Sequence, residues 1–212
     1  MNSQKTYFAC LDYEGTLIPG EAVQLGHIIA NISEPSDTLN HPFPIPSDIP
    51  VLTATAVDST QQTRKSESKI IHLFLDIPFL RGLGRKRQIE SEVNHEYTFR
   101  RIDSSWFKPT SGYYSASIAD VAATEVHNYL RATNFKLPLY MVVGKKEVIG
   151  GGRLRREVSN SVVGMKVKTA VLSRGETRLD DNRYLFAIKV VQLKCSRDGQ
   201  VSSADYNEGA ML

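Results

Sequence analysis

Basic residues are concentrated in the middle of this 212-residue chain. Residues 131–168 carry nine lysines and arginines against two acidic residues, whereas residues 1–62 carry one lysine against seven acidic residues. The overall charge of +3 therefore conceals one segment with a charge of +7. Such a segment predicts a surface that binds a polyanion, and charge alone leaves both acidic phospholipids and nucleic acid open.

The residue types that perform catalysis do not occur in catalytic patterns. The five histidines show no metal-like spacing with Cys, Asp or Glu, and the triple glycine at 150–152 is not followed by the Lys-Ser/Thr of a phosphate loop. No Gly-x-Ser-x-Gly elbow occurs, and Cys10 and Cys195 lack the motifs of nucleophilic cysteines. We therefore expect two free thiols, no metal, no cofactor and no enzymatic activity.

The composition is that of a globular protein, with 41% hydrophobic and 23% charged residues. No run of 18 or more apolar residues occurs, and the first residues lack the basic start and apolar core of a secretory signal. We expect a domain at 1–194, a short acidic tail at 195–212, and a cytoplasmic location.

Two runs of alternating residues surround a glycine-containing segment at 81–87. In 69–80 and in 89–101, apolar side chains recur at every second position, which is typical of strands. The sequence therefore predicts one long β-hairpin, whose apolar face could equally cover a helix. The polar residues 58–68 are interpreted as a loop or as part of this hairpin.

A second hairpin is predicted between residues 139 and 172. Its first strand covers 139–149, its connection contains the glycines and arginines of 150–156, and its return strand covers 161–172. The nearly continuous apolar run at 184–193 is typical of a central strand that is buried on both faces.

The remaining segments predict one helix and one irregular connection. Apolar residues recur at helical spacing after Ser117, which resembles the start of a capping box with Asp120, and the helix should end near Asn134. The prolines of 33–50 exclude helix and predict an extended surface connection.

The order of these segments resembles the gasdermin pore-forming domain. Residues 11–19 are similar to the Leu-Asp-x-x-Gly-x-Leu-Ile-Pro start of that domain, and 25–32 resemble a Gly-x-Ile-Ile segment of fungal gasdermin-like cell-death proteins. Residues 139–144, 150–153 and 184–190 resemble later strands of that group. The resemblance implies an α+β fold, a twisted antiparallel β-sheet with flanking helices.

The resemblance also implies a function, namely permeabilisation of membranes by inserted β-hairpins, leading to regulated cell death. The regions that would insert are about 51–101 and 139–172. The expected partners are acidic phospholipids, further copies of the chain in the pore, and an allelic partner chain or an activating protease. The protein would be cytoplasmic when inactive and would move to the plasma membrane or another acidic membrane when active.

Two sets of site residues follow from this interpretation. The membrane-inserting candidates are Ile71, Leu73, Leu75, Ile77, Phe79, Val93, Tyr97, Phe99, Val163, Met165 and Val167. The lipid-binding candidates are Lys145, Lys146, Arg153, Arg155, Arg156, Lys166, Lys168, Arg85, Lys86 and Arg87. The first residues of the chain are less basic than in animal gasdermins, since 1–14 contain only Lys5.

Two alternatives remain open. The basic segment could bind nucleic acid, although it lacks interleaved aromatic residues and any zinc or RNA-recognition signature. The chain could also be a soluble interaction module with no role at membranes. The basic turn 81–87 could cross the bilayer or stay in solvent.

Overall fold

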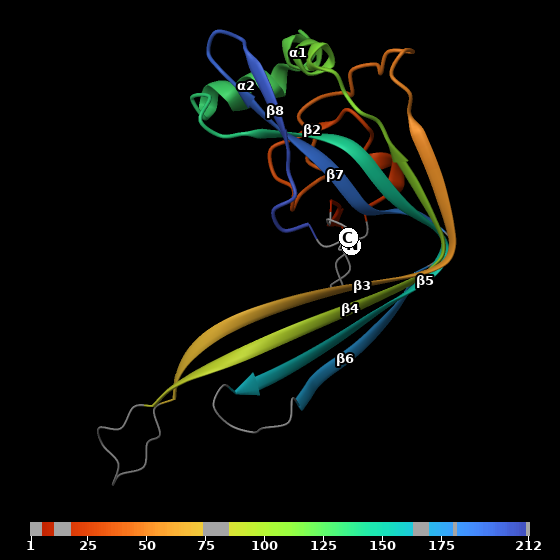
Figure 1. Ribbon diagram of the computed structural model, residues 1–212, viewed down its shortest axis with the longest axis vertical. Coiled ribbons are helices and arrows are strands. Elements are labelled where there is room, and N and C mark those ends of the chain that lie inside the picture. Colours follow the sequence, from red (N-terminus) through yellow and green to blue (C-terminus); the bar gives the residue numbers. More distant parts are fainter. Residues whose placement is uncertain (1–5, 11–17, 74–84, 163–169, 180–181, 211–212) are drawn as a thin grey trace. The chain divides into compact units, whose positions relative to one another are not determined.

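Figure 1 shows the computed structural model of the chain, which describes residues 6–10, 18–73, 85–162, 170–179 and 182–210. Side chains are described for 6–10, 18–58, 60, 96–149 and 182–210. The chain divides into two units: unit 1 contains residues 1–59, 99–152 and 180–212, and unit 2 contains residues 60–98 and 153–179.

The described elements make an α+β fold built on one sheet. They are β1 (Phe8–Ala9), the 3-10 turn η1 (Gly20–Ala22), β2 (Ile28–Ile29), β3 (Leu52–Leu73), β4 (Arg85–Trp106), α1 (Ser111–Ala119), α2 (Thr124–Ala132), β5 (Leu139–Val162), β6 (Ala170–Leu179), β7 (Arg183–Cys195) and β8 (Val201–Asp205). The strand order is β1-β7-β5-β4-β3, with β2 and β6 also paired to β5 and β8 paired to β7. The pairings whose register is described are antiparallel, as the sequence predicts.

Strand β7 is the centre of unit 1. It pairs with β5 over Leu139–Ile149, with β8, and with β1. Its residues 185–188 are all buried, which confirms the prediction of a central strand covered on both faces. Strand β6 also pairs with β5, whose 139–149 portion is paired with β7.

The alternation of side chains along β5 separates the core of unit 1 into two clusters. Met141 and Val143 pack with the two helices on one face of the sheet. Val142 packs on the other face with residues of the first part of the chain, including Ile18 and Val23. Figure 1 shows both helices in unit 1. The two faces of the sheet in unit 1 therefore have separate covers, since successive side chains of a strand point to opposite sides.

The single helix predicted after Ser117 is wrong, because two helices occupy this region. Ser117 lies inside α1, where its Oγ donates to the Tyr113 carbonyl at 2.8 Å. Asp120 interrupts the helical path, because its side chain accepts from the Ala122 N–H at 3.0 Å and its carbonyl accepts from the Ala123 N–H at 3.0 Å. Asp side chains compete with the helix in this way and favour turns. The predicted end near Asn134 is close, since α2 ends at Ala132.

The proline-rich segment 33–50 contains no helix or named strand, as predicted. It differs from a simple surface connection, however, because Phe43 and Ile49 pack against the core that holds the helices. The Tyr113 hydroxyl donates to the Phe43 carbonyl at 2.7 Å, which fixes the segment to α1.

The two predicted hairpins are present as neighbouring strands, but their bounds differ from the prediction. Strands β3 and β4 pair and are longer than expected, so that 58–68 is strand and 85–87 belongs to β4. The predicted turn at 150–156 is wrong, because β5 continues through it to Val162. Glycine permits a turn but does not require one, since its N–H and C=O can pair in a ladder like any other. The return strand β6 covers 170–179, and 74–84 and 163–169 lie outside the described residues.

We predict that replacing one buried side chain next to α2 by a smaller one destabilises the protein. Val126 is fully buried, so Val126→Ala should lower the free energy of unfolding by about 2 kcal/mol through lost burial and the cavity left behind. Val121, 88% exposed in the turn before α2, provides the matched control, and Val121→Ala should change stability by less than about 0.5 kcal/mol. Urea unfolding of both variants measures the difference, and equal losses would contradict this description of the core.

Candidate functional site

The described side chains of the predicted lipid-binding set are Lys145 and Lys146, and both make contacts within unit 1. The Lys145 Nζ donates to the carbonyls of Gly20 and Val23 at 3.3 and 3.2 Å, and its side chain is 15% exposed. The Lys146 Nζ lies 4.6 Å from the centre of the Tyr7 ring, and burial lowers the pKa of Lys146. Their contact with lipid stays a prediction, and in this conformation neither lysine is a freely exposed cation.

Lys145 belongs to a charged network that crosses four elements of unit 1. Its Nζ lies 3.2 Å from the Glu147 Oε1, and the Arg183 Nη1 donates to the Glu147 Oε2 at 3.3 Å. Arg183 also lies 4.0 Å from the Asp103 Oδ2. Arg101 and the Thr55 hydroxyl donate to the Asp103 Oδ1 at 2.7 and 2.8 Å. The network therefore connects β3, β4, β5 and β7.

Glu147 is the buried member of this network. It is 5% exposed, and its Oε1 has the ion-pair contact with Lys145 but no well-aligned hydrogen bond among the described residues. A Cβ at Gly20 would lie 2.5 Å from this oxygen, so the site requires a glycine for the close approach of the backbone. A buried carboxylate of this kind is tolerated only while its cationic partners stay in place.

The Asp103 carboxylate is the more exposed acid of the network. Burial alone would raise its pKa, but the hydrogen bonds from Arg101 and Thr55 and the charges of Arg101 and Arg183 outweigh burial and lower the pKa. Asp103 therefore stays ionised in the fold over the whole physiological range.

Other titratable groups of unit 1 are adapted to burial. Burial, with the charges of His41 and Lys145, lowers the pKa of His27 to about 4, so its neutral Nδ1 accepts the Gln24 N–H at 3.1 Å. Burial raises the pKa of Cys10 to about 12, and Cys10 and Cys195 are free thiols, as predicted. Among the described residues, no group of three or more His, Cys, Asp or Glu could hold a metal ion.

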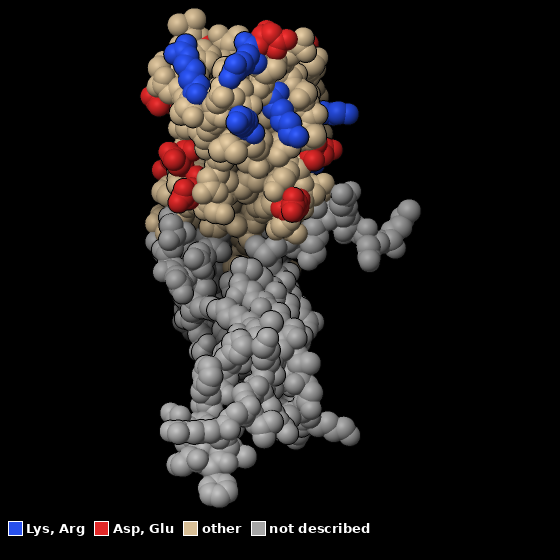
Figure 2. All heavy atoms as spheres, turned by 90° about the vertical axis from the view of Figure 1, so that its left-hand side faces the viewer, with Lys and Arg blue, Asp and Glu red and all other residues tan. Residues whose placement is uncertain are grey.

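A basic cluster that the sequence analysis did not select lies at one end of unit 1. It consists of Arg131 at the end of α2, Lys136 after it, Lys194 on β7 and Arg197 in the β7–β8 turn, all exposed. Arg197 donates a hydrogen bond to the Asn134 Oδ1, which joins the turn to the end of α2. Figure 2 shows lysine and arginine side chains gathered on one end of unit 1.

The charge of this basic cluster is poorly balanced by its neighbours in sequence. Residues 127–138 contain no acidic residue, and residues 194–202 contain only Asp198, which accepts a hydrogen bond from Ser196. Arg131 and Lys136 belong to the basic segment seen in the sequence, but Lys194 and Arg197 join them only through the β5–β7 pairing and the turn. The spacing of these residues in the sequence does not indicate that the fold brings them together.

The other predicted site residues fall outside the side chains that the structure describes, except for two. Tyr97 and Phe99 on β4 are 2% and 1% exposed, and the Phe99 ring packs edge-on against Phe186 at 4.9 Å. The backbones of Ile71, Leu73, Val93, Arg85, Lys86, Arg87, Arg153, Arg155 and Arg156 lie in strands, and nothing further is described for them. Leu75, Ile77, Phe79, Val163, Met165, Val167, Lys166 and Lys168 lie outside the described residues.

Part of the segment 195–212, which was expected to be an acidic tail, belongs to the sheet of unit 1. Strand β8 pairs with β7 from Val201 to Asp205, and the Tyr206 ring stacks on Phe8 at 5.8 Å. None of the described helices is long and apolar enough to cross a bilayer.

Comparison with solved structures gives a likeness at the level of the fold. No family model and no curated protein matches the chain. The chain is similar to a chain in the cryo-EM structure of the Gasdermin A3 membrane pore, at 8% identity and a TM-score of 0.35. The match covers 75% of this chain and 66% of that one, just under two thirds of its length. A likeness this distant carries no argument about activity.

We predict that the two acids of the charged network contribute very different amounts to the free energy of unfolding. Glu147→Gln leaves the buried Lys145 without its counter-charge and should lower the free energy of unfolding by about 3 kcal/mol. Asp103→Asn is the same chemical change at a more exposed acid, whose partners Arg101 and Arg183 are about half exposed, and should cost less than about 1 kcal/mol. Thermal and urea unfolding give both values, and an equal cost would show that burial does not make the Glu147 contact more important than the Asp103 contact.

Proposed function

We propose that the protein permeabilises membranes by inserting the strands of unit 2 as β-hairpins in an oligomer. The observation that carries the proposal is the length of these strands. Unit 2 holds residues 60–73 of β3 and 85–98 of β4, which are 14 residues each, and residues 153–162 of β5 and 170–179 of β6, which are 10 each. A strand that crosses the hydrocarbon of a bilayer needs about 9–11 residues. Each of the four strands therefore suffices for one crossing.

The composition of unit 2 supports the same function. All of its described residues are in strands, so among them no helix supplies a second layer. A sheet without a second layer is not a stable domain by itself and needs a surface to cover its apolar face. In the sequence of β4, one alternating set is Ile89, Ser91, Val93, His95 and Tyr97, and the other is the more polar set Glu90, Glu92, Asn94 and Glu96. This pattern suits a strand with hydrocarbon on one side and water on the other.

Oligomerisation follows from the backbone. Four strands in lipid would leave two edges of unpaired N–H and C=O groups, each of which costs several kcal/mol in hydrocarbon. Pairing with the strands of further copies removes these edges, so insertion and assembly are expected to occur together.

The basic cluster supports attraction to acidic bilayers. Each Lys or Arg near an anionic surface contributes about 1 kcal/mol, so its four cations could hold the protein at the surface before insertion. This function is not enzymatic. Insertion into the plasma membrane would collapse ion gradients and cause regulated cell death, with the inactive protein in the cytoplasm, as the sequence resemblance to fungal gasdermin-like proteins suggests.

Nucleic-acid binding is the second candidate, because the same basic cluster would attract phosphodiesters. Among its described neighbours, the cluster offers no row of exposed aromatic rings on which bases could stack. Binding of RNA in preference to acidic vesicles at equal ionic strength would favour this second function.

We predict that acidic vesicles leak on addition of the protein and that the basic cluster controls this. Vesicles of phosphatidylcholine with phosphatidylserine or cardiolipin should release trapped dye, and vesicles of phosphatidylcholine alone should release much less. Replacing Arg131, Lys136, Lys194 and Arg197 together by Gln removes about 4 kcal/mol of attraction and should weaken binding by about a thousandfold. Sedimentation with vesicles measures binding, and dye release measures leakage.

The matched control changes charge in the opposite direction at the same place. Asp198→Asn removes the one acid of the turn and should strengthen binding to acidic vesicles. Circular dichroism must show that all variants are folded. Leakage that does not depend on acidic lipid or on these charges would contradict the role of the cluster, and no leakage from any vesicle would refute the proposed function.

We predict further that β6 enters the bilayer as a strand. Single cysteines at 171–178, in a Cys10→Ala, Cys195→Ala background, are labelled with an environment-sensitive fluorophore. On acidic vesicles the emission should shift to the blue at every second position, because alternate residues of a membrane strand meet hydrocarbon and water. A label at Asn128, exposed on α2, serves as the control and should not report hydrocarbon. Leakage without this alternation would exclude insertion of β6.

A further inference from the structure

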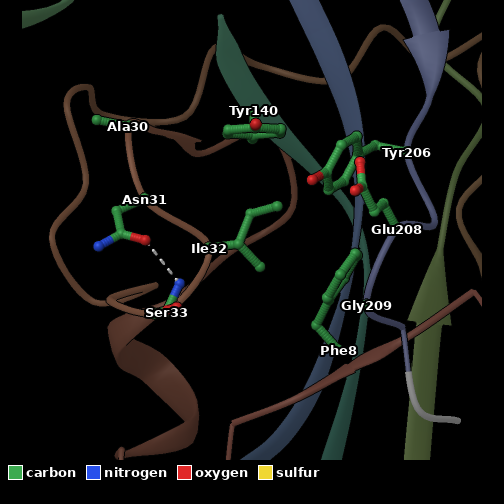
Figure 3. Close-up of a pocket in the computed structure, with 9 residues that line it drawn as sticks. All are labelled: Phe8, Ala30, Asn31, Ile32, Ser33, Tyr140, Tyr206, Glu208 and Gly209. Carbon is green, nitrogen blue, oxygen red and sulfur yellow. Dashed lines mark hydrogen bonds between the residues drawn. The ribbon is translucent and has the colours of Figure 1, made fainter.

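An aromatic cavity in unit 1 takes no part in the function proposed above. It has a volume of about 380 Å³ and lies between the loop 30–33 and the segment 206–209. Figure 3 shows its lining, in which the rings of Phe8, Tyr140 and Tyr206 stand opposite the loop that carries Asn31 and Ile32. We call it the tyrosine cavity.

The three rings are held by one another. Tyr206 stacks on Phe8 with 5.8 Å between ring centres and 17° between planes, and meets Tyr140 edge-on at 5.1 Å and 61°. Phe8 is 9% exposed, and both tyrosines are half-buried. Burial raises the pKa of Tyr206, as do the neighbouring Tyr140 and Glu208, so its phenol stays neutral. The cavity therefore has preformed aromatic walls, which attract cations to their faces.

The charge around the tyrosine cavity also favours a cation. Its one ionisable carboxyl group is that of Glu208, and none of the nine lining residues is Lys or Arg. Among the described residues, Glu208 forms no ion pair. Asn31 is already committed, since its Nδ2 donates to Glu34 at 3.2 Å and its Oδ1 accepts the Ser33 N–H at 3.0 Å.

The kind of cation follows from the walls. Phe8, Ala30 and Ile32 offer only apolar side chains and Glu208 is the one charged acceptor, so a primary ammonium would replace only some of its hydrogen bonds to water. A metal ion would find one carboxylate, and among the described residues no group of three possible ligands exists. A quaternary ammonium has no N–H to satisfy, and its methyl groups pack against rings.

We propose that the tyrosine cavity binds a quaternary ammonium group of the choline type. Free choline compounds and the headgroup of phosphatidylcholine share this chemistry. The site joins four distant parts of the chain, because Phe8, the loop 30–33, β5 and the segment after β8 each contribute to it.

The test uses the full chain and soluble probes. Choline is titrated by calorimetry and by ¹H–¹⁵N spectra, in which the amides of Asn31, Tyr140 and Tyr206 should shift. The uncharged carbon isostere 3,3-dimethylbutan-1-ol and the unmethylated ethanolamine should each bind at least about tenfold more weakly. Equal binding of the isostere, or no binding of choline, would overturn the proposal.

Three variants distinguish the contributions of the Tyr206 ring, the Tyr206 hydroxyl and the Glu208 charge to choline binding. Tyr206→Leu should weaken choline binding by about tenfold or more, whereas Tyr206→Phe keeps the ring and should stay within about threefold of the wild type. Glu208→Gln should weaken binding several-fold and reduce its dependence on salt. If Tyr206→Leu proves unfolded by circular dichroism, Glu208→Gln and the isostere decide the outcome. Loss of choline binding in Tyr206→Phe alone would show that the hydroxyl, and not the ring, forms the site.

Two further arms distinguish the source of the group. Dihexanoylphosphatidylcholine that displaces choline with higher affinity would indicate the lipid headgroup, and a preference for free choline would indicate a soluble ligand. This result is independent of pore formation, because choline can bind to a protein that never permeabilises a vesicle, and leakage can persist in Tyr206→Leu.

Discussion

The ladder between β5 and β7 is the constraint on which the described structure depends. Over residues 139–149, β5 is held against the most buried strand of unit 1, and the register shifts at Val142/Gly144 and Lys146/Glu147. Such irregularities bend a strand and increase its twist. The same strand continues to Val162, and its last ten residues belong to unit 2. Packing in unit 1 therefore fixes one end of a strand whose other end belongs to a unit in which the described residues are all in strands.

The charged network lies on the part of β5 where the register shifts. Glu147 follows the second shift, and Arg183, which contacts it, is the first residue of β7. A buried ion pair gives little net stability compared with apolar packing, but removing one partner is costly. The charged network acts more directly on the β5–β7 register, because few other registers would let Lys145, Glu147 and Arg183 all keep partners of opposite charge. Surface ion pairs such as Arg101–Asp103 lack this effect because water can replace either partner.

The sequence predicted what depends on local periodicity. The alternation at 89–101 and in the described residues 69–73, together with the apolar run at 184–193, identified strands, because period two is a property of the chain itself. The predicted ends of the strands were less accurate where a residue type allows a turn without requiring one. The glycines at 150–152 allow a turn, yet β5 runs through them. The prediction of a single helix after Ser117 was wrong because the Asp120 side chain stabilises a turn that interrupts the helical path. The spacing of apolar residues does not reveal such a turn. The basic cluster and the tyrosine cavity were missed because Arg197 meets Asn134, and Tyr206 meets Phe8, only in the folded chain.

The division of apolar surface between the two units bears on how insertion could begin. In unit 1 the two faces of β5 and β7 have their own covers, and the exposed large hydrophobic residues of the described β3 portion are few, Leu52 and Val57. Burial of this kind makes unit 1 costly to unfold, at roughly 25 cal/mol for each Å² of apolar surface returned to water. In unit 2 the described residues are all in strands, at 60–73, 85–98, 153–162 and 170–179, and among them no helix forms a comparable second layer. In the insertion proposed above, we therefore expect rearrangement to start in unit 2, because pairing with neighbouring copies and contact with lipid would supply the second layer that its described residues lack.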